Sequence, residues 1–140
     1  MSLQVITALT ALMDKVREFR YLKGEDKLAN EIAQHLKVAS IVGDFRGIWF
    51  HVPNEQVVKT PIEAKRIAKK CALGMIPGAP DLVFMNAETS LLVELKVGKN
   101  KLSENQARFC TWADKASVPY VIARSWKELK LLLTQHGFLK

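Results

Sequence analysis

The stretch PDLVFMNAETSLLVELKV, residues 80–97, decides the fold, because it contains two short apolar runs separated by a polar connection. DLVFM (81–85) and LLVELKV (91–97) are rich in the aliphatic, aromatic and β-branched residues that favour strands. The intervening NAETS (86–90) is polar and has a length suited to a hairpin loop. We therefore expect the two runs to pair as neighbouring antiparallel strands.

Two further strands and several helices flank this hairpin. The apolar runs IWFHV and PYVIA predict short strands at 48–52 and 119–123. Apolar residues recur at three- and four-residue steps from Val5 to Phe19, which predicts an amphipathic helix within residues 1–23. A second helix is predicted over 25–38.

Capping boxes mark the starts of three more helices, at Thr60, Ser103 and Ser125. The helix after Thr60 has Pro61 at its first position and should end near Gly74. Strands that alternate with helices, together with one hairpin, predict an α/β fold. We expect helices to cover both faces of a mixed sheet of about four strands, with further N-terminal helices before it.

Length and composition narrow the class of protein. A chain of 140 residues that is 49% hydrophobic fits one globular domain over 1–140. The net charge of +7 favours a polyanionic partner such as nucleic acid. Cys71 and Cys110 lie too far apart to indicate a zinc site. No apolar run reaches about 18 residues and the first residues lack a signal-peptide plan, so we expect a cytoplasmic protein with no membrane partner.

Charged side chains interrupt the second strand of the hairpin. Side chains alternate along a strand, so Glu94 and Lys96 share one face. Two charges on a buried strand are costly unless they pair with each other, a metal or a ligand. Asp81 begins the partner strand directly after Gly78-Ala79-Pro80, so Asp81 and Glu94 could converge on one divalent cation. A solvent-facing salt bridge is the alternative.

The order Pro80-Asp81, twelve residues, then Glu94-Leu95-Lys96 resembles the PD-(D/E)xK signature of restriction-endonuclease-like nucleases. Together with GMIPGAPDLVF, ELKVGKNKLSENQ and HVPNE, it resembles the VRR-NUC family of virus-type replication and repair nucleases. The likeness covers roughly residues 25–123 and implies a restriction-endonuclease-like core.

The resemblance implies a role for each matching residue. Asp81 and Glu94 would bind Mg²⁺ or Mn²⁺, the Leu95 carbonyl would add a ligand, and Lys96 would orient the attacking water. Phosphodiester hydrolysis needs an activated water and neutralisation of charge on the phosphate, which a divalent ion and an ammonium supply. Gln106 matches the family's downstream glutamine, although it is also the third-position partner in the Ser103 capping box.

The family also has an acid on an early helix and a motif at the strand before the basic helix. Glu25 and Glu31 are the two candidates for that acid, as a further catalytic residue and metal ligand. Glu25 lies in the middle of the apolar stripe of its helix and Glu31 about 120° away, so we favour Glu25. Within HVPNE, Asn54 and Glu55 are expected near the metal site, unless Pro53-Asn54 merely ends the strand.

Basic side chains are concentrated in two segments. The helix after Thr60 has a basic face opposite an apolar one, made by Lys65, Arg66, Lys69 and Lys70. Such a face is most often simply solvated. Beside a nuclease centre it would bind DNA phosphates, as would Lys99 and Lys101 after the catalytic strand. Binding of this kind predicts an affinity that falls steeply with salt.

The sequence thus favours a metal-dependent, structure-selective DNA endonuclease that acts in replication and repair in a bacterial or phage-infected cell. The family-level expectation is a Holliday-junction resolvase or a flap nuclease. A four-way junction is two-fold symmetric, so paired incisions would require a homodimer, with residues 1–23 as the interface. A restriction-like or exonucleolytic DNase, and a catalytically inactive DNA-binding module, are the alternatives.

Overall fold

The computed structural model describes residues 1–53 and 58–140. In those ranges the helices are α1 (Leu3–Leu12), α2 (Gly24–Val42), α3 (Pro61–Ala72), α4 (Glu104–Lys115) and α5 (Trp126–Gln135). The strands are β1 (Ile48–His51), β2 (Leu82–Met85), β3 (Ser90–Leu95) and β4 (Tyr120–Ala123). Every strand that the sequence predicts is present, with ends that differ by one or two residues.

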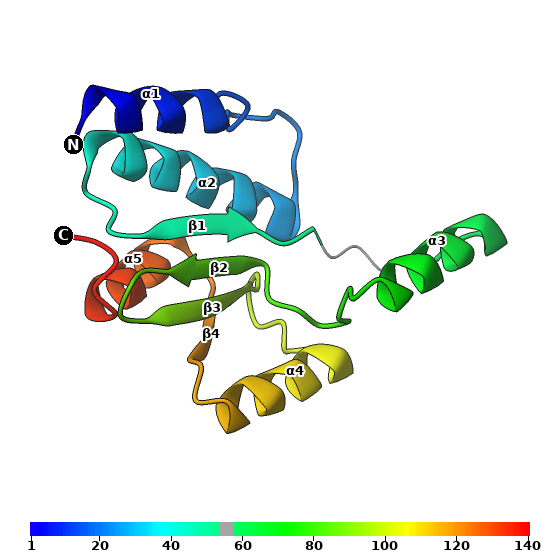
Figure 1. The fold of residues 1–140 in the computed structure, drawn as a ribbon. Helices are drawn as coiled ribbons and strands as arrows, with labels where there is room; N and C mark the ends of the chain where they lie inside the picture. Colours follow the sequence, from blue (N-terminus) through cyan, green and yellow to red (C-terminus); the bar gives the residue numbers. More distant parts are fainter. Residues whose placement is uncertain (54–57) are drawn as a thin grey trace.

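The four strands form one mixed sheet in the order β1-β2-β3-β4 (Figure 1). β1 with β2 and β2 with β3 pair antiparallel, whereas β3 and β4 pair parallel. Leu82 lies opposite Val93 across the hairpin, and Glu94 lies opposite Ile122 across the parallel pair. The prediction of a mixed four-stranded sheet with one hairpin is confirmed.

One face of the sheet forms the hydrophobic core. Leu91, Val93 and Leu95 point from β3 into this face, where α2 and α5 cover the strands. Helices α2 and α5 contribute apolar side chains that are fully buried: Ile32, Leu36, Leu129 and Leu133. Burial of this apolar surface is the main force that holds the two helices on the sheet.

The opposite face is covered by α4 next to β4. The ring of Phe109 on α4 contacts the ring of Tyr120 on β4, with centroids 6.1 Å apart. Glu94 belongs to this face because it alternates with the core residues of β3. The expected helices on both faces are therefore present, and the face under α4 holds the charged residues.

The first helix is shorter than the sequence predicts. The apolar stripe extends to Phe19, but α1 ends at Leu12. Beyond it, the side chains of α2 bind the backbone: Asn30 accepts from the Phe19 N–H and donates to the Arg17 carbonyl, and Lys37 donates to the Val16 carbonyl. These bonds satisfy backbone groups that a longer helix would have paired internally.

Helix α2 is longer than predicted and ends at Val42 instead of about Val38. Gly43 closes it with a left-handed φ of 86°, which favours glycine. The extra turn contributes a buried contact, because Ser40 accepts a hydrogen bond of 2.9 Å from the Trp49 ring nitrogen on β1. The end of α2 is thereby attached to the edge of the sheet.

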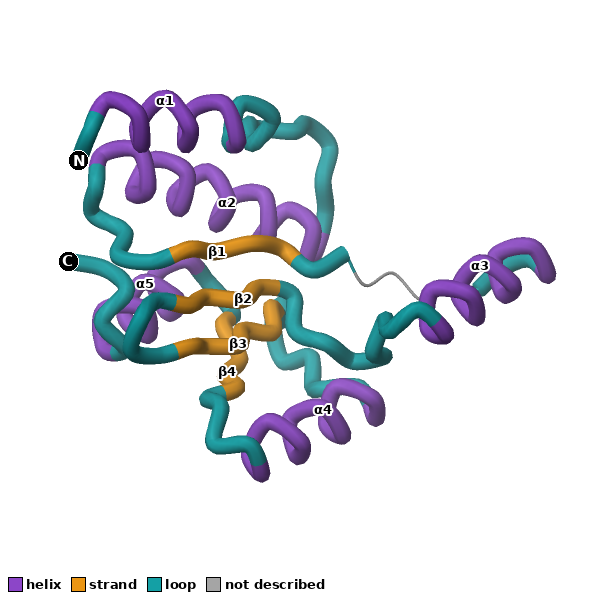
Figure 2. The backbone as a smooth tube through the Cα atoms, in the orientation of Figure 1, coloured by secondary structure: helices purple, strands orange, loops and turns teal. Residues whose placement is uncertain are grey.

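Helix α3 stands apart from the rest of the molecule (Figure 2). Its bounds match the prediction, with Pro61 at the first position and Thr60 as the N-cap. It has no buried residue and packs against no other helix or strand of the described residues. None of the helices in 1–53 and 58–140 combines the length and apolar character that a membrane span requires.

Candidate active site

The loop before β2 is fixed against the first turn of α4. Gly78 is buried and has a φ of 81°, a conformation that side chains disfavour. A Cβ atom there would overlap the backbone of Asn105 and lie 2.7 Å from the Gln106 nitrogen. Only glycine allows this close approach, which brings the loop that precedes Asp81 next to Gln106.

The backbone and the carboxylate of Asp81 are both held by neighbouring strands. Its carbonyl accepts a 2.8 Å hydrogen bond from the Val52 N–H, and the His51 Nδ1 lies 3.0 Å from the same oxygen. Its carboxylate Oδ2 accepts a 2.7 Å bond from the Leu95 N–H. Asp81 is therefore oriented toward the end of β3, beside Glu94.

Glu94 is almost completely buried, with 2% of its surface exposed. Its Oε1 accepts a 2.7 Å hydrogen bond from the Gln106 Nε2, and its Oε2 lies 3.4 Å from the Tyr120 hydroxyl, which donates to it. Burial first, then the charge of Asp81 and a side-chain hydrogen bond to Asp81, together raise the pKa of Glu94 to about 8, although the charge of Lys96 lowers it. Burial and the Glu94 carboxylate also raise the pKa of Tyr120.

Gln106 completes the predicted capping box and also contacts Glu94. Its Oε1 accepts a 2.8 Å bond from the Ser103 N–H, while its own N–H donates to the Ser103 hydroxyl, which completes the capping box. Its Nε2 is then free to donate to Glu94. The start of α4 and the position of the Glu94 carboxylate are thus linked through one amide.

Lys96 follows β3 and is 7% exposed. Its Nζ lies 3.9 Å from the Glu25 Oε1, at the first turn of α2. Between the two acids considered for this helix, the structure brings Glu25 beside Lys96, whereas Glu31 is exposed and lines hollows along α2. Glu25, Asp81, Glu94, Lys96 and Gln106 therefore gather at one end of the sheet.

The donor set here fits a hard divalent cation. Two carboxylates lie side by side, and one of them is buried enough that its charged form is disfavoured. Two neighbouring carboxylates with little solvent around them repel each other when both are ionised, and Mg²⁺ or Mn²⁺ would relieve that repulsion. Carboxylate oxygens are ligands that these ions prefer. Asp81 and Glu94 would hold such an ion.

In residues 1–53 and 58–140, no three His, Cys, Asp or Glu side chains are grouped closely enough to hold a metal ion together. Glu25 is engaged with Lys96 and does not complete a third carboxylate ligand beside Asp81 and Glu94. The Leu95 N–H is bound to Asp81. The roles of Glu25 and of the Leu95 carbonyl as metal ligands stay predictions.

The expected DNA-binding side chains lie on exposed surfaces. All four basic residues of α3 are exposed: Lys65, Arg66, Lys69 and Lys70. Lys99 and Lys101 are exposed on the loop that follows β3. Asn54 and Glu55, expected near the metal site, lie outside the described residues.

Tyr120, His51 and Arg124 approach this region without having been predicted. Arg124, directly after β4, donates from one guanidinium nitrogen to the Gly98 and Asn100 carbonyls, at 2.9 Å each, and so fixes the loop that carries Lys99 and Lys101. Tyr120 reaches Glu94 because β4 pairs parallel with β3. That contact joins residues 26 positions apart, and no local pattern in the sequence predicts it.

Comparison with known proteins supports the fold. No family model matches the sequence, and no curated protein matches it. A solved structure described as a "VRR_NUC domain protein" is similar with a TM-score of 0.51 at 16% identity, over 96% of this chain and 85% of that one. At that identity the likeness is one of fold, and it agrees with the predicted nuclease-type core.

A separate hollow of about 630 Å³ lies between α2 and α5, where His35 stacks on Trp126. It contains neither Asp81 nor Glu94. The carboxylate pair instead lies where β2 begins and β3 ends (Figure 1), between the starts of α2 and α4. The chemistry of the side chains, and not the size of a hollow, identifies the candidate site.

Proposed function

We propose that this protein is a divalent-metal-dependent nuclease of the VRR-NUC type that hydrolyses phosphodiester bonds in DNA. The observation that carries the proposal is the buried Glu94 beside Asp81, with the ammonium of Lys96 following on the same strand. A buried acid beside a second acid and a buried lysine is costly for stability and suits a catalytic centre. The similarity of fold to a VRR_NUC domain protein supports it.

Each side chain has a role in this mechanism. Asp81 and Glu94 would hold Mg²⁺ or Mn²⁺, which supplies the Lewis acid that activates water and offsets charge on the phosphate. Lys96 would orient the attacking water and stabilise the negative charge that develops. Gln106 and the Leu95 N–H keep the two carboxylates in position through hydrogen bonds of 2.7 Å. Glu25 would set the position of the Lys96 ammonium.

The exposed basic residues would hold the DNA backbone. Helix α3 carries four of them and projects beyond the end of the sheet where Asp81 and Glu94 lie (Figure 1). Lys99 and Lys101 lie on a loop that Arg124 fixes beside the same end. Contacts to phosphate give affinity with little dependence on base sequence, which suits an enzyme that reads DNA structure.

We propose branched or flapped DNA as the substrate and a homodimer as the active form on four-way junctions. Helix α1 supports the dimer, because it has no buried residue and exposes Leu3, Val5 and Leu12. Such apolar surface is typical of an interface. Light scattering after gel filtration measures the mass; a monomer at working concentrations would rule out junction resolution by paired sites.

Two alternative functions would involve the same residues. A restriction-like or exonucleolytic DNase would use the same residues on another DNA substrate. A catalytically inactive DNA-binding module would retain only the basic surfaces. The presence of Asp81, Glu94 and Lys96 together argues against the inactive module, since the charges of Glu94 and Lys96 are costly to bury unless they serve a function.

The test is a cleavage panel with labelled four-way junction, flap, duplex and single-stranded DNA, each with Mg²⁺, Mn²⁺ or EDTA. We expect cleavage of branched DNA with either metal and none with EDTA. Duplex cleavage at defined sequences, or processive loss of end nucleotides, would instead support the restriction-like or exonucleolytic reading. Binding without cleavage under all conditions would reject the nuclease proposal.

A further inference from the structure

The segment between α1 and α2 is held in place by side chains of α2. Asn30 bonds to the backbone of both Arg17 and Phe19, at 2.9 and 3.2 Å, and the Lys37 Nζ donates to the Val16 carbonyl at 2.8 Å. These bonds fix the backbone on the helix. The side chains that follow point away from it.

Two aromatic rings on this segment face solvent. Phe19 is 68% exposed and Tyr21 is 93% exposed. Tyr21 has a φ of 68°, a left-handed conformation that glycine adopts easily and that is unfavourable for a bulky residue. Strain and exposure of a large ring are both unfavourable, so they indicate that the position serves binding and not packing.

Basic side chains, together with the exposed Glu18, lie around the rings. Arg17, Arg20, Lys23 and Lys27 surround the segment and all are exposed. A hollow of about 550 Å³ borders it. Its lining includes Phe19, Arg20 and Tyr21 of the segment, Lys27, Asn30 and Gln34 of α2, and the acidic Glu18 and Glu31. Aromatic faces interleaved with cations are the surface that single-stranded nucleic acid binds, through stacked bases and paired phosphates.

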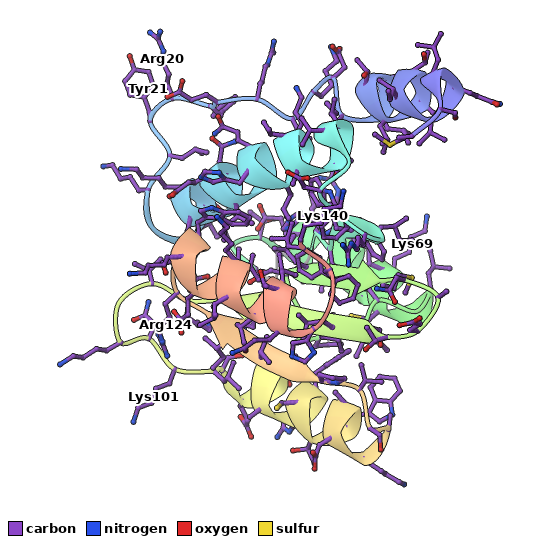
Figure 3. All side chains as sticks on the ribbon, turned by 90° about the vertical axis from the view of Figure 1, so that its left-hand side faces the viewer. Arg20, Tyr21, Lys69, Lys101, Arg124 and Lys140 are labelled. Carbon is purple, nitrogen blue, oxygen red and sulfur yellow. The ribbon has the colours of Figure 1, made fainter. Side chains whose placement is uncertain are left out.

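This surface is close to the candidate active site. Tyr21 precedes Glu25 by four residues, so their Cα atoms are at most about 14 Å apart. Glu25 in turn lies 3.9 Å from the Lys96 ammonium. Figure 1 shows the segment descending at the end of the molecule where β3 ends. In Figure 3, Arg20 and Tyr21 project from the same side of the molecule as Lys101 and Arg124.

We propose that Tyr21 stacks on an unpaired base of the DNA, with Arg20 and Lys23 on the neighbouring phosphates, and so places a single-stranded branch beside Asp81 and Glu94. The inference rests on the proposed nuclease function and adds the feature of the substrate that is recognised. Bases inside a duplex are already stacked on each other, so Tyr21 reaches only a base that is unpaired. Tyr21 is therefore a specificity-determining residue.

The test measures DNA binding in EDTA, so that it does not depend on cleavage. Three fluorescent DNAs are compared by anisotropy: a blunt duplex, the same duplex with a short single-stranded tail, and the duplex with a tail of abasic sites. The abasic tail keeps the phosphates and removes the bases. We expect wild-type protein to bind the base-containing tail about tenfold more tightly than the abasic one, as one stacked base contributes.

Variants then assign the preference to the ring. Tyr21→Ala should bind both tails equally and bind the blunt duplex as wild type does, while Tyr21→Phe should keep the tenfold preference. Trp112→Ala removes an exposed ring of α4 and should change nothing. Unfolding curves check that each variant is folded. An unchanged preference in Tyr21→Ala, or an equal loss on blunt duplex, would overturn the proposal.

The outcome is separate from that of the nuclease proposal. A base preference that depends on Tyr21, in a protein that cleaves none of the DNA panel, would retain the stacking site and reject the catalytic function. If the Tyr21→Ala variant cleaves branched DNA and shows the same tail preference as wild type, the catalytic function would be retained and the stacking site rejected.

Discussion

Helices α3 and α4 have the same length of 12 residues and both begin at a capped Ser or Thr, yet the molecule uses them differently. Helix α4 packs on β4 and positions Gln106 against Glu94. Helix α3 buries nothing and carries its basic residues into solvent. An amphipathic pattern therefore does not determine whether a helix is docked. Under the proposed function, the chemistry takes place beside α4 and the phosphates bind to α3.

The largest effect on turnover is expected from substitutions of the charged residues beside α4. Asp81→Ala, Glu94→Ala and Lys96→Ala should each reduce turnover by roughly a hundredfold or more, because they remove metal ligands or charge stabilisation. Affinity for DNA should stay close to wild type, since the basic surfaces are intact. Single-turnover cleavage and binding in EDTA measure the two quantities. Wild-type turnover in three folded variants would show that the assignment is wrong.

The glycines near the two helices differ in what surrounds them. Gly78→Ala should lower the free energy of unfolding by about 3 kcal/mol, because a Cβ would meet the backbone of α4 in a strained conformation. Gly74→Ala, after α3, is the matched control: its φ is also positive, but no atom lies within 4 Å of the added carbon. It should cost only about 1 kcal/mol. Urea unfolding measures both, and equal losses would contradict the close packing of the loop on α4.

The pKa of Glu94 makes stability depend on pH in a defined direction. Its pKa is about 8 in the folded protein and 4.5 in a free side chain, so the folded state holds more protons between these values. Stability of the metal-free protein should therefore fall as pH rises from about 4.5 to about 8. In EDTA, thermal unfolding of wild type should lose a few degrees across this window relative to Glu94→Gln. Lys69→Gln on α3 should follow the wild-type profile, and a flat difference between wild type and Glu94→Gln would refute the shift.

The smallest effect is expected from the charges of α3. Lys69→Gln with Lys70→Gln should reduce the slope of log affinity against log salt by about 2, with turnover unchanged at saturating DNA. Lys127→Gln with Lys130→Gln on α5 removes the same charge from exposed positions of another helix. That control should leave the slope unchanged. Equal slopes in both double variants would mean that α3 is only a solvated helix.

Local patterns predicted most of the fold. The capping boxes gave the starts of α3, α4 and α5, and alternation along β3 gave the buried face and the charged face. The predicted end of the first helix was wrong, because Asn30 and Lys37 bind the backbone of residues 16–19, which is distant from them in sequence. Tertiary bonds of this kind have no local signature.

The candidate site was predicted in part for the same reason. Asp81, Glu94 and Lys96 lie on or next to the strands of one hairpin, so the prediction of that hairpin was enough to predict that they lie close together. Tyr120 and Arg124 come from a strand that pairs in parallel after a helical crossover. Neither the register of that pair nor the docking of α4 can be derived from spacing alone.

The Gln106 amide has a polarity that its two partners impose. Its oxygen faces an N–H donor at Ser103 and its nitrogen faces a carboxylate oxygen of Glu94. A half-turn of the amide would oppose donor to donor and acceptor to acceptor, so the side chain has a single permitted orientation. Glutamate in its place, although nearly isosteric, would bring a third negative group against Glu94. At this position, one nitrogen atom distinguishes a donor that holds Glu94 from a carboxylate that would repel it.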